Sequence, residues 1–531
     1  MHKRVAISFF AMIAVFGLLI VNLALIIIDT ETSTSSQSKN TRSVVLSTSR
    51  GMIYDCNMKR LVNNSVEYLT VCLPTTDAFK LISQSITEEE KEEIYNNMTA
   101  GKTSILTTPQ IYNEPHLKSI GITNRYAHNQ LCVHLIGHLN ENGEGVMGLE
   151  KAYNSYLSQQ SGELKAIWGV DALNHILYGE EITTQNNGYL SPAGIQLTID
   201  SDIQKIAENV LAEFEIGKGA VVVMDSETAE ILACASVPEF DPLDLSSAIN
   251  DVISPFINRS TTPYSVGSVF KPFVATVAIE NNIDFIHNCT GSIEINGTIF
   301  NCSDSTAHGT VNMMRAMEVS CNTYFIALGQ KIGSENLLSL CGDFGLGESV
   351  ELADNMYLKS GKLPTAESIT SPQALANICF GQGELLVSPV QMSTAYCVFA
   401  NGGFYRPPTL MKGIIDKNGN IIQKVKLPES YRVISESTAE EIDKILESVV
   451  TNGNAQKAYS EFAECHGKTA TAQSGWYENG IEINHTWFCG YFTANGKKYV
   501  AVIFKEDGIS GSVDCAPVFK ELAESIYNLY A

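Results

Sequence analysis

Two apolar runs lie close together in the chain, Gly219-Ala-Val-Val-Val-Met-Asp225 and Ile231-Leu-Ala-Cys-Ala-Ser236, with a polar turn between them. Short runs rich in β-branched residues and bounded by turn residues are typical of paired strands. A third such run, Tyr499–Phe504, precedes a helical pattern over Ala516–Tyr530, and another helix is expected over Gln204–Phe214. Strands at both ends with helical material between them predict an α+β fold whose first and last strands share one sheet.

The length of the chain predicts several domains, because 531 residues at roughly 150 per domain correspond to about three units. Residues 193–531 are expected to form one large domain that opens with Leu197-Thr-Ile-Asp200. Residues 49–187 have a mixed pattern typical of a smaller domain. Their acidic stretch Thr87–Tyr95 predicts a helix with a solvated face.

The N-terminus has the pattern of a membrane anchor. Residues 1–4 contain Lys3 and Arg4, and the apolar run over residues 5–28 is long enough, at ~1.5 Å rise per residue, to cross a bilayer. The basic flank predicts a cytoplasmic N-terminus with the remainder of the chain outside the cell. No small-residue cleavage site follows, which argues against a cleaved signal peptide. Residues 29–48 are rich in Ser and Thr and are expected to form a flexible stalk.

Charge and composition exclude other classes of protein. The formal net charge is −23, so the surface repels phosphate backbones and nucleic acid is not an expected partner. A hydrophobic share of 44% excludes a mainly disordered chain. The thirteen cysteines include no Cys-x-x-Cys pair that would indicate zinc, so most are expected to be buried apolar thiols. No metal and no cofactor is expected.

Three short motifs can support nucleophilic catalysis when they occur in the right order. They occur several times: Ser-x-x-Lys at Ser36/Lys39 and Ser268/Lys271, Ser-x-Asn at Ser38/Asn40, Ser320/Asn322 and Ser334/Asn336, and Lys-Thr at Lys102 and Lys468. The copies before residue 41 overlap in the polar stalk, where nothing can hold a rigid site. Order and context therefore favour Ser268, Ser320 and Lys468.

Ser268 follows Tyr264-Ser-Val-Gly267 and begins an apolar helical run. A serine at a helix N-terminus lies where the N–H groups and the helix dipole favour developing negative charge. Lys271 is one turn further on and returns to the same face. A serine hydroxyl is a weak nucleophile that needs a base. Lys271 is a base only when neutral, which burial and a second nearby ammonium group, with Lys468 as the candidate, would favour.

The other two motifs supply polar groups of a kind that binds a peptide. Ser320-Cys-Asn322 and Lys468-Thr-Ala-Thr471 follow Ser268 in that order. In a strand, Thr469 and Thr471 point to the same face. Two hydroxyls and a lysine on a strand edge suit the terminal carboxylate of a peptide.

These motifs resemble those of the class B penicillin-binding proteins, the monofunctional D,D-transpeptidases that cross-link peptidoglycan. Four longer stretches are also similar to that family: Arg50-Gly-Met-Ile-Tyr-Asp55, Gly145-Val-Met-Gly-Leu-Glu150 with Tyr153, Gly381-Gln-Gly-Glu384 with Ser388-Pro389, Gln391 and Asn401-Gly-Gly403, and Trp487-Phe-Cys-Gly490. The resemblance covers the chain from about Arg50 to the C-terminus. It implies a penicillin-binding transpeptidase domain, with an antiparallel sheet and flanking helices, on a smaller N-terminal pedestal.

The resemblance also implies a role for each motif residue. Ser268 would be the acylated nucleophile and Lys271 its proton acceptor, while Ser320 and Lys468 relay the proton to the leaving amine. The backbone N–H groups of Ser268 and Thr471 would form the oxyanion hole. Substrate binding is implied for three further side chains, namely Asn322 for the amide, and Thr469 and Thr471 for the terminal carboxylate.

Expected partners follow from the same resemblance: peptidoglycan stem peptides, β-lactam antibiotics, the membrane through residues 5–28, and a polytopic glycosyltransferase of the division or elongation machinery. The family's Lys-Thr-Gly is Lys-Thr-Ala here, and the methyl group of Ala470 would narrow the substrate channel or alter β-lactam affinity. Cys289 and Cys302 flank a hairpin-like stretch, Ile293–Ile299, and could pair outside the membrane.

Two other functions stay open beside the transpeptidase. One is a β-lactamase or β-lactam sensor on the same fold, and the other is a non-catalytic scaffold of the cell-wall machinery, with Ala470 as a first sign of decay. The pedestal signature at Gly145–Glu150 favours the transpeptidase over the first. The intact motif residues Ser268, Lys271 and Lys468 argue against the second.

Overall fold

The computed structural model describes residues 12–21, 40–177, 179–478 and 480–531. Contacts divide the chain into two compact units, each discontinuous in sequence. The smaller unit takes the described residues of segments 1–48, 66–123 and 162–189, and the larger takes segments 49–65, 124–161 and 190–531. The fold is therefore multidomain, and each unit has its own sheets.

The predicted membrane span lies largely outside the described residues. Residues 12–21 are helical, whereas 5–11 and 22–28 are not described, nor are 29–39 of the expected stalk. Within the described part of the chain, no helix combines the length and apolar character that a membrane crossing needs. The rest of the expected stalk differs from the prediction, because Thr41–Ser49 form strand β1. The β-branched residues of this segment favour a strand, and β7 supplies its partner.

Besides the helical residues 12–21, the described part of the smaller unit contains two sheets and two helices. The three-stranded sheet has the order β1-β7-β8, with β7 at Gly162–Gly169 and β8 at Thr183–Asn187. The four-stranded sheet has the order β4-β3-β6-β5, with the bounds Ser65–Cys72 for β3, Ser104–Thr107 for β4, Asn113–Glu114 for β5 and Leu117–Asn124 for β6. Helices α2 (Thr76–Ile82) and α3 (Glu88–Thr99) complete the unit. The acidic stretch is helical as predicted, and Ile94 is the buried residue of α3.

A five-stranded antiparallel sheet organises the larger unit, in the order β11-β10-β26-β25-β24. Its strands are β10 (Gly219–Asp225), β11 (Ile231–Val237), β24 (Glu464–Glu478), β25 (Ile481–Ala494) and β26 (Lys497–Lys505). Strand β10 pairs with both β11 and β26. This pairing confirms the prediction that the first and last strands of the domain share one sheet.

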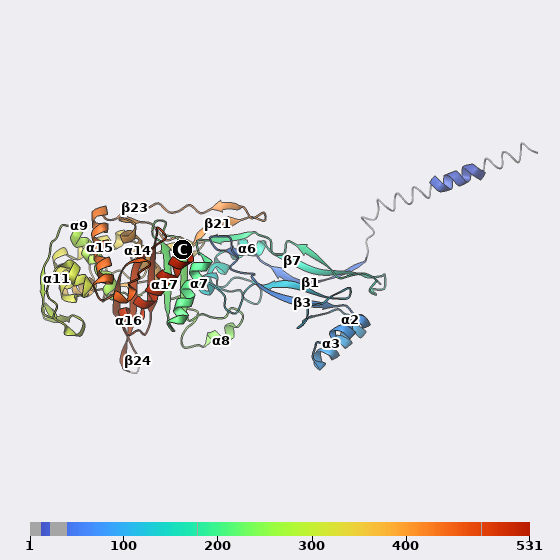
Figure 1. Cartoon of the computed structure of the whole chain (residues 1–531), viewed down its shortest axis with the longest axis horizontal. Coiled ribbons are helices and arrows are strands. Elements are labelled where there is room, and N and C mark those ends of the chain that lie inside the picture. The colour runs from blue at the N-terminus through green and yellow to red at the C-terminus, as the bar shows by residue number, and fades with distance from the viewer. Residues whose placement is uncertain (1–11, 22–39, 178, 479) are drawn as a thin grey trace, which may run out of the picture. The chain divides into compact units, whose positions relative to one another are not determined.

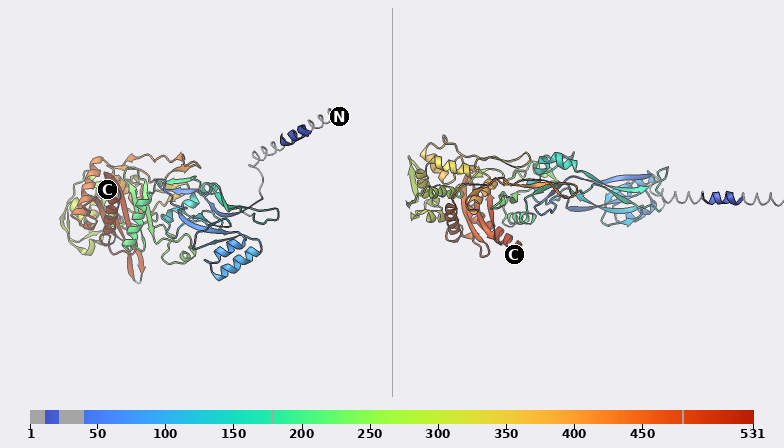
Figure 2. Two further views of the ribbon diagram at one scale, coloured as in Figure 1. Left: turned by 45° about the vertical axis from the view of Figure 1, so that its right-hand side comes forward. Right: turned by 90° about the horizontal axis from the view of Figure 1, so that it is seen from above.

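Helices cover this sheet. Helix α7 (Ser201–Glu213) and the C-terminal α17 (Ala516–Leu529) contact each other and the sheet. Helices α14 (Pro389–Ala400) and α15 (Glu436–Thr451) contact each other and the strands β24–β26. All residues of α14 are buried, as expected for a helix that is apolar on every side. Figure 1 and Figure 2 show α9 (Lys271–Glu280) and α11 (Asn322–Ile332) grouped at one end of this unit.

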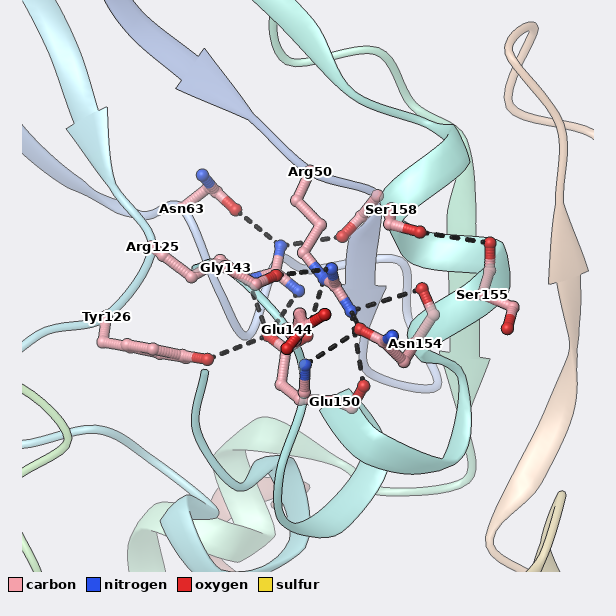
Figure 3. A network of polar contacts seen from close by, with 12 residues as sticks. Arg50, Asn63, Arg125, Tyr126, Gly143, Glu144, Glu150, Asn154, Ser155 and Ser158 are labelled. Atoms are coloured by element: carbon pink, nitrogen blue, oxygen red, sulfur yellow. Dashed lines mark hydrogen bonds and ion pairs between the residues drawn. The ribbon is translucent and has the colours of Figure 1, made fainter. Parts of the chain in front are cut away.

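A buried ion-pair network joins two of the stretches noted in the sequence (Figure 3). Glu150 is fully buried, and its carboxylate forms ion pairs with Arg50 Nε at 2.9 Å and with Arg125 Nη2 at 2.6 Å. The Tyr126 hydroxyl donates to the same carboxylate at 3.1 Å. Arg50 Nη2 also donates to the Asn154 side chain at 2.8 Å. The network holds the segments around residues 50, 125 and 150 together inside the larger unit.

Candidate active site

Ser268 lies in a short 3-10 helix, Gly267–Phe270, that leads directly into α9. Its neighbours are held by buried hydrogen bonds: Trp487 Nε1 donates to the Ser265 carbonyl at 2.9 Å, and Tyr396 Oη to the Val269 carbonyl at 2.8 Å. Ser268 is half-buried. It lines a cleft of about 670 Å³ in the larger unit. The nucleophile is therefore accessible on a rigid support.

Lys271 is completely buried at the start of α9. Its Nζ donates to the Ser320 carbonyl at 2.7 Å, to Ser320 Oγ at 3.0 Å and to Asn322 Oδ1 at 2.7 Å. Two of the three sequence motifs are thus brought into direct contact. The described side chains include no hydrogen bond to the Ser268 hydroxyl, and catalytic contacts of this kind often tighten only when substrate binds.

Ser320 joins the two lysines. Lys468, also completely buried, donates from Nζ to Ser320 Oγ at 3.1 Å and to the Thr469 carbonyl at 3.0 Å. Ser320 has a φ of +53°, a left-handed conformation that non-glycine residues rarely adopt and that is concentrated at functional sites. The strained backbone places one hydroxyl between two amines.

Burial lowers the pKa of both amines. The pKa of Lys271 falls to about 7, because its charged form loses hydration, while the thiols of Cys321 and Cys302 oppose the shift. The pKa of Lys468 is lowered as well, first by burial and then by the charge of Lys271. The sequence-based hypothesis named both burial and Lys468 as causes of a lowered Lys271 pKa, and burial is the cause that the structure bears out.

The remaining predicted residues line the same cleft. Asn322, Thr469, Thr471 and Ala470 are all part of its wall. Thr471 Oγ1 accepts from the backbone N–H of Gly511 at 3.3 Å. Ala470 also lines the cleft, but only 3% of the residue is exposed, so its methyl group takes up little of the cleft surface.

The other copies of the motifs lie elsewhere. Ser334 and Asn336 belong to α12 (Ser334–Asp343) and are not among the residues that line the cleft. Lys102 belongs to the smaller unit. Ser36, Ser38 and Lys39 lie outside the described residues.

Two further groups support the site and were not assigned a role from the sequence. The Gly381 carbonyl accepts a hydrogen bond from the Gly267 N–H at 2.8 Å. Glycine is required at position 381, because its φ is +79° and a Cβ added there would lie only 1.8 Å from the Gly267 carbonyl oxygen. The Gly381–Glu384 stretch was the available signal. Asn454 accepts from Thr469 Oγ1 at 3.3 Å, and no motif marks it in the sequence.

Comparison with known proteins agrees with this geometry. Residues 219–524 match the family model of the penicillin binding protein transpeptidase domain. The chain belongs to this family. Among its relatives, stage V sporulation protein D of Bacillus subtilis is 28% identical over 490 residues, which cover 86% of this chain and 73% of that protein. The peptidoglycan D,D-transpeptidase MrdA of Escherichia coli is 27% identical over 490 residues, covering 77% of this chain and 74% of MrdA.

Solved structures show the same penicillin-binding protein fold. Penicillin binding protein 3 of Mycobacterium tuberculosis, solved in complex with aztreonam, has a TM-score of 0.65 at 21% identity, covering 92% of this chain and 97% of that one. A chain from a peptidoglycan synthase complex has a TM-score of 0.69 at 24% identity, with 99% and 98% covered. The predicted transpeptidase fold, with its antiparallel sheet and flanking helices, is confirmed.

Proposed function

We propose that this chain is a peptidoglycan D,D-transpeptidase that cross-links stem peptides through an acyl-enzyme on Ser268 and is inhibited by β-lactams. The observation that carries the proposal is the convergence of Lys271 and Lys468 on Ser320 Oγ, at 3.0 and 3.1 Å, in a cleft that Ser268 also lines. The family assignment and the D,D-transpeptidase activity named for MrdA support the substrate class.

In the acylation step, Ser268 Oγ attacks the carbonyl carbon between the two terminal D-alanines, and the neutral amine of Lys271 accepts the hydroxyl proton. A positioned base of this kind contributes ~10²–10⁴-fold. The oxyanion would be stabilised by the N–H groups of Ser268 and Thr471, each such donor being worth on the order of 10²–10³-fold. The segments that carry Ser268 and Thr471 pack closely, which supports this pairing: a Cβ added at Gly267 would lie only 3.2 Å from the Thr471 carbonyl oxygen.

The second half of the reaction uses the Ser320 hydroxyl and the amines of Lys271 and Lys468 as a proton relay. When the C–N bond of the substrate breaks, Ser320 and Lys468 deliver a proton to the departing D-alanine amine. The amine of a neighbouring stem peptide then attacks the ester carbon. It gives up a proton through the same groups, and Ser268 recovers its own proton as the cross-linked product leaves.

Substrate orientation falls to the polar wall of the cleft. Asn322 is the proposed partner of the substrate amide, and Thr469 and Thr471 bind the terminal carboxylate, with Lys468 beneath them. Asn322 Nδ2 already donates to the Asn301 carbonyl at 2.9 Å, which fixes the orientation of its amide. Two hydroxyls on one strand edge can donate to both carboxylate oxygens.

We also propose that residues 5–28 anchor the enzyme in the cell membrane, with residues 1–4 cytoplasmic and the catalytic unit outside. The long apolar run and its basic flank support this orientation. A polytopic glycosyltransferase is the proposed membrane partner. The likeness to a chain from a peptidoglycan synthase complex supports such a pairing.

Cross-linking of nascent peptidoglycan with pentapeptide stems tests the function. The parent protein should release D-alanine and form cross-linked muropeptides, as measured by mass spectrometry. Ser268→Ala should abolish both products, whereas Ser36→Ala, in the other Ser-x-x-Lys motif, should retain them. Absence of D-alanine release by the parent, with a polymerising glycosyltransferase present, would contradict the proposal.

Fluorescent penicillin separates the competing functions. A transpeptidase should give a stable adduct that persists over the time of gel analysis. A β-lactamase or sensor that deacylates would give a transient adduct, and a scaffold without activity would give none. Only the first outcome supports the proposed function.

A further inference from the structure

Three cysteines and one histidine come together beside the catalytic cleft. Cys289 ends β13 (His287–Cys289), Cys302 follows β15 (Thr298–Asn301), His308 precedes β16 (Gly309–Val311), and Cys321 precedes α11. Their Sγ and imidazole nitrogen atoms all lie within 4.8 Å of one another. The three cysteines are buried and His308 is half-buried. Among the residues that the structure describes, this is the one group of three or more potential metal-binding side chains.

The spacing of these atoms fits a tetrahedral ion. Cys302 Sγ lies 3.7 Å from Cys289 Sγ and 3.8 Å from Cys321 Sγ, and Cys289 Sγ lies 3.4 Å from His308 Nδ1. With Zn–S and Zn–N bonds of about 2.3 and 2.0–2.1 Å at tetrahedral angles, S···S separations of about 3.8 Å and S···N separations of about 3.6 Å are expected. The side chains therefore already surround a space of the right size.

Neither a disulfide nor apolar packing accounts for the cluster as well as a metal ion does. A disulfide requires sulfurs about 2.05 Å apart, whereas all thirteen cysteines are free thiols. Cys302 is almost equally distant from two sulfurs, so no pair is singled out. Buried cysteines that act only as small apolar groups pack among apolar neighbours, but this cluster includes an imidazole and lies against the Thr323 hydroxyl.

We propose that Cys289, Cys302, His308 and Cys321 bind one Zn²⁺ ion in a closed structural site. Three sulfurs and one imidazole nitrogen form a donor set typical of structural zinc. On binding, the three thiols release their protons to solvent and His308 coordinates as the neutral imidazole. Four protein ligands leave no open coordination position, so the ion would hold the structure together rather than take part in acyl transfer.

The surroundings of the cluster suit coordinated thiolates. Thr323 Oγ1 lies 3.4 Å from Cys321 Sγ and 3.9 Å from Cys302 Sγ. His287 Nε2 lies 3.2 Å from the same hydroxyl. Hydrogen bonds of this kind orient metal ligands and tune their basicity. The half-buried His308 gives the ion a route from solvent.

The ion would fix the position of a catalytic motif. Cys321 stands between Ser320 and Asn322, and Cys302 is next to Asn301, whose carbonyl accepts from Asn322 Nδ2 at 2.9 Å. One ion would thus tie the segment over residues 289–308 to the start of α11. This consequence rests on the proposed function, whereas binding of the metal does not.

Metal analysis of the full-length protein tests the proposal. The protein purified without chelator should contain about one zinc per chain. Cys289→Ser and His308→Ala should each lower the zinc content to a small fraction of this value. Cys341→Ala, at a buried cysteine in α12 outside the cluster, should leave it unchanged.

Cobalt substitution of the parent protein provides a measurement that does not depend on the folding of any variant. Co²⁺ bound by this cluster should show the absorption of a tetrahedral cobalt–thiolate site, and Zn²⁺ should displace it. A parent protein that holds neither metal, a cobalt spectrum without thiolate bands, or a disulfide between Cys289 and Cys302 in non-reduced peptides would each overturn the proposal.

Loss of zinc should also slow acylation by fluorescent penicillin. A zinc-loaded parent protein that is not labelled by fluorescent penicillin would instead contradict the proposed function, without bearing on the metal site.

Discussion

Lys271 has an unusual environment for a lysine, because its amine is fully buried and none of its three hydrogen-bond acceptors is a carboxylate. Burial lowers its pKa to about 7. The charged form therefore predominates below about pH 7 and the neutral form above it. Because only the neutral amine can accept the proton of Ser268, the base becomes available as the pH rises through this value.

The acylation rate should accordingly rise as the pH increases through about 7 and level off above it. Lys271→Arg keeps a positive charge that cannot be lost at working pH, so it should lose acylation about as fully as Lys271→Ala. Stopped-flow measurement of β-lactam acylation against pH gives both results. Near-parent rates in Lys271→Arg would show that Lys271 is not the general base.

Lys468→Ala should slow acylation but leave the acid limb of the profile near pH 7, because burial is the main cause of the Lys271 shift. The same pH series with this variant provides the measurement. A limb that moves to clearly higher pH would support the sequence-based hypothesis that Lys468 lowers the pKa of Lys271.

Gly381 supports the nucleophile at close range, and its replacement should disturb the Ser268 backbone. A Cβ at Gly381 meets the Gly267 carbonyl, and a displacement of about 1 Å near a reacting group can cost on the order of 10²-fold in rate. Gly402 has the same φ of +79° but open space around its Cβ. Gly402→Ala therefore carries the same backbone strain as Gly381→Ala without the clash, and it should retain acylation. Equal losses in the two variants would point to instability rather than to displacement of Ser268.

At the level of secondary structure, local patterns predicted the elements that bury an apolar face. Strand β10 has the predicted bounds, and α17 differs from the prediction by one residue. The relation between elements was harder to predict. The four proposed zinc ligands, Cys289, Cys302, His308 and Cys321, are 13, 6 and 13 residues apart in sequence, without the short spacing typical of zinc sites. Only the pairing of β13 with β16 and the position of α11 bring them together.

The catalytic residues were predictable because three motifs and their order are local features of the sequence. The position of Ser320 Oγ between two lysines was not, since it depends on a left-handed backbone at Ser320 and on the packing of β24 near α9. Asn454 is a similar case, because its contact with Thr469 arises only from tertiary structure.

The network around Glu150 links several elements and should be important for stability (Figure 3). Removing its charge leaves Arg50 and Arg125 without their buried counter-ion, and breaking a buried pair typically costs about 3–5 kcal/mol. Glu150→Gln should therefore lower the free energy of unfolding by roughly this amount. Glu144→Gln removes the same charge from an exposed neighbour and should change stability by no more than about 0.5 kcal/mol. Denaturant titration of both variants checks the difference, and similar values would mean that the network contributes little.

At the level of the whole molecule, the proposed membrane anchor at the N-terminus would determine where the enzyme works. We expect residues 1–28 to remain attached to the mature protein, because the apolar run is long and no cleavage site follows it. Intact-mass analysis of protein extracted from membranes should find the complete N-terminus. A mature N-terminus near Thr30 would show that the segment is a cleaved signal peptide.

Ser268 is the residue on which the acyl-enzyme should form, and peptide mass mapping of a β-lactam adduct identifies the acylated residue. The parent protein is incubated with a β-lactam, digested and analysed for the peptide that carries the added mass. A single adduct on Ser268 is expected, which should be absent in Ser268→Ala and retained in Ser334→Ala. An adduct on another residue, or none under conditions where the protein is folded, would contradict the assignment of the nucleophile.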